Sequence, residues 1–177
     1  MKAGDVYLKV KDRYDITVYR IKEVRQDDCQ AEYIKISTYE MFYSEFADTF
    51  TISEMTSLGQ IKSSVFDELL DIQKNYLEEI RTVLEMDAYE TDMEIEVGEI
   101  YTDDTYIFQI DSEEDNKWGY WYLMMDEDHL VFEEKWGECP KDKFGRYIHH
   151  ITDYSLTRIN ELKEQLLDDI VKSIWGV

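Results

Sequence analysis

The chain has 177 residues, with 19 basic and 41 acidic side chains and a formal net charge of −22. A charge this negative repels nucleic acids and anionic membranes and speeds encounter with basic surfaces, so we expect neither direct nucleic-acid binding nor membrane binding. A hydrophobic fraction of 44% is nevertheless sufficient for a packed core.

The composition also indicates a compartment. No stretch approaches the roughly 18 to 20 apolar residues that cross a bilayer, and the first ten residues lack the apolar core of a signal peptide. Cys29 and Cys139 are the two cysteines, and they lie far apart without CxxC spacing. This usage is typical of a reducing environment, so we expect a cytoplasmic protein.

The first half of the sequence predicts several short strands, beginning near Gly4, and one long helix. Gly4–Tyr7 (Gly-Asp-Val-Tyr) opens a series of short β-branched and aromatic runs, and a long amphipathic helix begins near Ser63 or Ser64. Its apolar residues recur at spacings of three and four, which predicts one buried face. The strands expected in this half are Val6–Val10, Asp15–Ile21 and Ala31–Ile36.

The second half repeats this order. Gly98–Tyr101 (Gly-Glu-Ile-Tyr) matches the first start, and a second amphipathic helix begins near Ser155 and stops at Gly176. Residues 111–116 are expected to form a polar hairpin loop, and a tight loop joins antiparallel neighbours. The strands expected here are Glu99–Thr102, Tyr106–Ile110, Trp118–Met125 and Leu130–Glu134.

The sequence therefore predicts an α+β fold with two tandem, diverged units. Each unit is expected to be a short antiparallel β-meander followed by one long amphipathic helix, over residues 1–88 and 89–177. The two units pack either separately or as one pseudo-twofold domain, and the apolar helix faces also leave a homodimer open.

The sharpest functional pattern is acidic. The second half carries most of the net charge. If its acidic runs follow adjacent strands and turns, they form an anionic ridge with carboxylates spaced like phosphates; the alternative is a solvated face that keeps the chain soluble. The carboxylates expected to bind a partner are Asp103, Asp104, Asp111, Glu113, Glu114, Asp115, Asp126, Glu127 and Asp128.

Aromatic residues crowd the same half. Alternation along a strand places Trp118, Tyr120 and Tyr122 on one face and Trp121 on the other, so at least one side is expected to be buried. Trp118 and Trp136 are the predicted anchors for a partner protein if they are exposed, and core packing is the alternative.

Catalytic and metal motifs are not found in the sequence. It has no Gly-rich phosphate loop, nucleophile elbow, zinc-protease helix or thiol motif. Adjacent His149 and His150 point to opposite sides of a strand, which is poor metal-ligand geometry, and residues 111–115 lack the central glycine of a calcium loop. We expect no enzyme, no catalytic residue, no metal and no cofactor.

Small size, high acidity and intracellular cysteine usage together are similar to the profile of phage anti-defence proteins, including anti-CRISPR and anti-restriction DNA mimics. This resemblance is one of composition and assigns no residue a role. It implies an inhibitor that blocks the basic groove of a nuclease or another nucleic-acid-binding protein. The alternative is a non-catalytic interaction or immunity-type module whose acidity serves solubility.

Overall fold

The computed structural model describes residues 1–12, 15–87, 94–103, 105–131, 134–144 and 148–176. The chain divides into two compact units. Unit 1 comprises Met1–Lys74, Asp128–Leu130 and Asp168–Val177, and unit 2 comprises Asn75–Glu127 and Val131–Leu167. The expected boundary at residue 88 lies outside the described residues.

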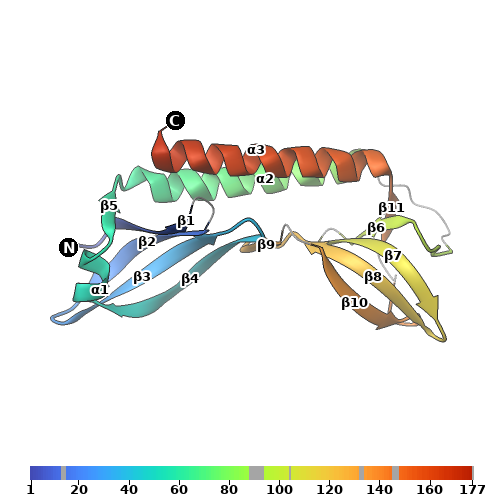
Figure 1. The fold of residues 1–177 in the computed structure, drawn as a ribbon, viewed down its shortest axis with the longest axis horizontal. Coiled ribbons are helices and arrows are strands. Elements are labelled where there is room, and N and C mark those ends of the chain that lie inside the picture. The colour runs from blue at the N-terminus through green and yellow to red at the C-terminus, as the bar shows by residue number, and fades with distance from the viewer. Residues whose placement is uncertain (13–14, 88–93, 104, 132–133, 145–147, 177) are drawn as a thin grey trace. The chain divides into compact units, whose positions relative to one another are not determined.

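The sheet of unit 1 is an antiparallel meander with additions at both edges (Figure 1). A short helix, α1 (Ile52–Thr56), connects the fourth strand to the fifth, which turns back to pair with the first. The spatial order is β5-β1-β2-β3-β4-β9. The strands are β1 (Val6–Asp12), β2 (Asp15–Val24), β3 (Asp28–Ile36), β4 (Glu40–Thr51), β5 (Gly59–Ile61) and β9 (His129–Val131).

The sheet of unit 2 has the order β10-β8-β7-β6-β11, so its five strands repeat the order β4-β3-β2-β1-β5 of the first sheet. The two starts have the same turn. Gly4 N–H donates to the Ile21 carbonyl at 2.9 Å, and Gly98 N–H donates to the Ile110 carbonyl at 2.8 Å, both glycines having positive φ. The strands are β6 (Ile100–Thr102), β7 (Tyr106–Glu114), β8 (Lys117–Met124), β10 (Lys135–Pro140) and β11 (His149–Ile151).

The two long helices correct the predicted fold. The α+β class and the antiparallel sheets are present, but the assignment of one long helix to each tandem unit is wrong. Helix α2 (Ser64–Asp87) and helix α3 (Asp153–Trp175) each contribute residues to both units. Neither unit therefore contains a whole long helix.

The strand expected at Leu130–Glu134 is also misplaced. We predicted it as the fourth strand of the second meander, but β9 joins the first sheet, where the Tyr43 N–H donates to the Asp128 carbonyl at 2.8 Å. The fourth position in the second sheet belongs to β10, which the sequence analysis did not predict. Residues 132–133 lie outside the described residues.

A buried carboxylate joins helix α2 to the sheet within unit 1. Glu32 is 1% exposed and contacts Arg20, which also contacts Asp67 of α2. The Tyr43 hydroxyl donates to Glu32 at 2.9 Å, and the Arg20 guanidinium lies 4.2 Å from the centre of the Phe66 ring. Burial raises the pKa of Glu32, but the hydrogen bonds from Arg20 and Tyr43 outweigh it, and the net shift is downward. The site is therefore a paired, charged anchor.

No helix among the described residues is both long enough and apolar enough to span a bilayer.

Candidate functional site: an aromatic pocket in unit 2

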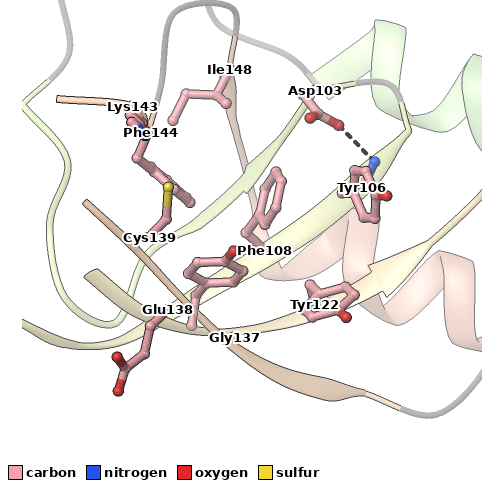
Figure 2. A pocket seen from close by; sticks show the side chains of 11 residues that line it. Asp103, Tyr106, Phe108, Tyr122, Gly137, Glu138, Cys139, Lys143, Phe144 and Ile148 are labelled. Atoms are coloured by element: carbon pink, nitrogen blue, oxygen red, sulfur yellow. Dashed lines mark hydrogen bonds between the residues drawn. The ribbon is translucent and has the colours of Figure 1, made fainter. Parts of the chain in front are cut away.

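A pocket of about 410 Å³ opens on one face of the second sheet (Figure 2). Its walls come from β7, β8 and β10 and from the segment that follows β10. The lining residues are Asp103, Tyr106, Phe108, Tyr120, Tyr122, Gly137, Glu138, Cys139, Lys143, Phe144 and Ile148.

Four of the rings come from two neighbouring strands. Tyr106 and Phe108 lie two residues apart on β7, and Tyr120 and Tyr122 lie two residues apart on β8, so strand alternation points all four to one face. Phe108 pairs in register with Tyr122. Ring centroids are 5.7 Å apart for Tyr106 and Phe108, 5.8 Å for Tyr106 and Tyr122, and 5.4 Å for Phe108 and Tyr120. The strands thus build a continuous aromatic wall.

Phe144 supplies a fifth ring from outside the sheet. A turn after β10, in which the Phe144 N–H donates to the Pro140 carbonyl at 3.2 Å, returns the chain toward β7 and β8. The Phe144 ring centroid lies 5.3 Å from that of Phe108 and 5.2 Å from that of Tyr120. This ring therefore forms a second side of the pocket.

The charges around the pocket are few. Asp103 is half-buried, and its Oδ1 accepts from the N–H of Tyr106 at 2.7 Å and of Thr105 at 3.1 Å. Glu138 forms an ion pair with Lys117 at 3.2 Å, and its carboxylate points away from the rings in Figure 2. Lys143 is exposed. Among the described lining residues, Asp103 is thus the carboxylate held at the pocket by hydrogen bonds.

The Tyr120 phenol stays neutral in ordinary buffers. Burial raises the pKa of Tyr120, and nearby Cys139, Tyr122 and Tyr106 raise it further. Neutral aromatic rings present electron-rich faces, which attract a cation within about 6 Å of the ring centroid. In chemical terms the pocket offers apolar contact and cation–π attraction.

In unit 1, core side chains fill the position that corresponds to the pocket of unit 2. Ile21 is in register with Ala31 there, whereas Ile110 is in register with Tyr120 in unit 2. Met55 of α1 is 1% exposed and packs in one core cluster with Ile21 and Ala31. The short helix thus fills in unit 1 a space that tyrosines and Phe144 line in unit 2.

The predicted acidic residues do not form one ridge. Asp111, Glu113, Glu114 and Asp115 are exposed on the hairpin between β7 and β8, and Asp126, Glu127 and Asp128 are exposed beyond the other end of β8. Eight residues of strand, about 26 Å, separate the two groups. Asp103 lines the pocket, and Asp104 lies outside the described residues.

The two tryptophans predicted as anchors for a partner, Trp118 and Trp136, differ in exposure. Trp118 is 7% exposed in the cluster of Tyr101, Phe108 and Ile110, with the Lys141 ammonium 4.5 Å from its ring centre. Trp136 is 43% exposed, with its ring centroid 5.4 Å from that of Trp121. Trp118 therefore belongs to the core, whereas Trp136 is accessible.

The pocket was not predicted from the sequence. Strand alternation placed Tyr120 and Tyr122 correctly on one face, but Tyr106, Phe108 and Phe144 were not predicted to join them. The alternating aromatics of β7, placed opposite those of β8, were the available signal. The position of Phe144 depends on a turn that carries no sequence motif.

Comparisons with known protein families, with curated proteins and with solved structures find no match for this chain.

Proposed function

We propose that the chain is a non-catalytic binding protein whose unit 2 takes up a positively charged side chain from a basic protein partner. The observation that carries this proposal is the pocket of five aromatic rings with the Asp103 carboxylate at its edge. Aromatic faces beside a carboxylate favour a cation over a neutral or anionic group. The net charge of −22 attracts basic surfaces over a longer range.

A protein partner fits the site better than free small cations do. The pocket is open on one side, and unit 2 also carries exposed carboxylates, such as Glu114 and Asp115, for other basic residues of a protein partner. Such contacts add electrostatic attraction and association rate. We place this activity in the cytoplasm, in keeping with the free thiols of Cys29 and Cys139.

The proposal is tested by titrating the full chain with lysine-rich and arginine-rich peptides in a calorimeter. We expect binding that weakens as salt rises and that falls at least about tenfold in Phe144→Ala, which removes one ring of the pocket. Tyr154→Ala is the matched control, because Tyr154 is 73% exposed on α3. Absence of binding to every basic peptide, or equal binding by both variants, would refute the pocket as the site.

A second candidate is an inhibitor that mimics a nucleic acid, of the phage anti-defence kind. The exposed run of Glu113, Glu114 and Asp115 at the tip of a hairpin supports it, because a protruding acidic tip can enter a basic groove. The test is inhibition of purified nucleases by the wild type and by a Glu113→Gln, Glu114→Gln, Asp115→Asn variant. Inhibition that persists at high salt, or in the neutralised variant, would rule out mimicry by this hairpin.

A further inference from the structure

The pocket offers few hydrogen-bond acceptors for a desolvated ammonium group. A primary ammonium carries three N–H donors, and leaving donors unpaired on burial is costly. Oδ1 of Asp103 already accepts two backbone N–H groups, and Glu138 is engaged by Lys117. The remaining acceptor atoms of the described lining side chains are phenol oxygens and the Cys139 sulfur, which are weaker acceptors than a carboxylate.

The size of the pocket also favours a cation larger than a primary ammonium. A water molecule occupies about 30 Å³ in the liquid, and a primary ammonium is of similar size. Such a group would leave most of the 410 Å³ unfilled, whereas a larger apolar cation contacts several rings at once. A guanidinium group is larger, but its five N–H donors need a planar set of acceptors, which the single carboxylate of Asp103, with its Oδ1 already accepting two N–H groups, does not provide.

We infer that the cation recognised by this pocket is a methylated ammonium group, with trimethyllysine in a protein partner as its source. This inference rests on the proposed function and specifies its ligand. Methylation removes the N–H donors and adds apolar surface while the positive charge is kept. The methyl groups then contact the partly exposed rings of Tyr106, Tyr120, Tyr122 and Phe144, which pack around the buried Phe108, and the Asp103 carboxylate supplies the counter-charge.

Substitutions of Asp103 and Lys143 test the positive charge of the ligand, because they should change its affinity in opposite directions. Asp103→Asn keeps a side-chain oxygen that accepts from Tyr106 and Thr105, so the turn is retained while the negative charge is lost. We expect it to weaken binding of the methylated ligand several-fold without lowering the melting temperature. Lys143 is exposed at the rim and repels a cation, so Lys143→Gln strengthens binding.

The experiment is a calorimetric titration of the full chain with one basic peptide carrying a single lysine in its unmodified, monomethyl, dimethyl and trimethyl forms. A neutral tert-butyl analogue of trimethyllysine is the control for shape. We expect affinity to rise with each methyl group, to about tenfold between the unmodified and trimethyl peptides, and to be lost in the neutral analogue. Phe144→Leu, which keeps apolar volume without a ring, should abolish the difference between the peptides.

Different results would overturn the cation site for a protein partner and the methylated ligand separately. Equal affinity across the methylation series, with Phe144→Ala still weakening every peptide, would overturn the methylated ligand and leave a general cation site. Choline is titrated in the same way, and its binding to the pocket without binding of any peptide would keep the ligand chemistry and overturn the protein partner. No binding of any of these cations would overturn both.

Discussion

Gly137 lies directly opposite Tyr120 in the pair of β10 and β8, and the tyrosine ring covers the glycine. A Cβ at position 137 would lie 3.0 Å from Cε2 of Tyr120 and 3.1 Å from its Cζ, which is closer than side chains normally approach. The absence of a side chain on β10 therefore sets the position of one pocket ring.

Gly137→Ala should displace the Tyr120 ring by a few tenths of an ångström. We expect ligand affinity to fall about threefold, because dispersion and cation–π contacts weaken steeply with small gaps. The free energy of unfolding should change little, because the edge of the pocket can yield. Titration and thermal denaturation of the same variant measure the two effects.

Gly119→Ala is the contrasting variant. Its added Cβ would lie 2.5 Å from Oγ of Ser112 and 2.6 Å from Cη2 of Trp136. We expect a loss of about 1–3 kcal/mol in unfolding free energy from overpacking. Equal stability of the two glycine variants would contradict this assignment of close approach.

Arg20→Met should destabilise unit 1 strongly. The substitution leaves Glu32, which is 1% exposed, without its main cationic partner. Breaking a buried ion pair costs about 3 kcal/mol or more. Lys22→Met is the matched control, because Lys22 is half exposed and 3.4 Å from the same carboxylate, so its loss should cost less than about 1 kcal/mol. Chemical denaturation at neutral pH measures both.

Acid should weaken the fold through Glu40 as well as Glu32. A hydrogen bond with His129 and another from Lys35 lower the pKa of Glu40 within unit 1, although burial opposes them. A carboxylate with a depressed folded pKa stabilises the fold above its unfolded pKa of about 4.3, and this contribution is lost as pH falls through the folded value. The wild type should therefore lose more stability between pH 5 and pH 3 than Glu40→Gln does. Parallel pH profiles would contradict this.

Thr51→Ala should loosen the helix that fills the core of unit 1. Thr51 caps α1, accepting from the Glu54 N–H at 3.2 Å, while the Glu54 carboxylate accepts from the Thr51 N–H at 2.8 Å. Loss of such a cap costs about 1 kcal/mol. Thr51→Ser, which keeps the hydroxyl, should retain most of the stability in a denaturant titration.

Local patterns predicted most of the local structure. Alternation placed β1, β2, β3, β7 and β8 within a few residues, and the start of α2, predicted near Ser63 or Ser64, lies at Ser64. β4 was missed, because Ser44, Glu45 and Asp48 are polar and the segment does not alternate as a half-buried strand does.

The pairing of distant strands and the division of the helices between the units could not be predicted from local sequence patterns. Leu130 fits either sheet by its apolar character, and only the pairing of β9 with β4 decides. Likewise, nothing in the spacing of Leu162, Leu166 and Ile170 along α3 indicates that the first two belong to one unit and the third to the other. The role of the acidic runs as a partner surface stays a prediction.

The division of both long helices between the units has a consequence for the protein as a gene product. A premature stop near the middle of the reading frame removes Asp128–Leu130 and Asp168–Val177, which belong to unit 1, even though most of that unit has been translated. Conversely, a chain that starts in the middle lacks the part of α2 that belongs to unit 2. Because each half lacks residues of its own unit, we expect the two halves, produced as separate polypeptides, to gain structure on mixing, as in a fragment-complementation pair.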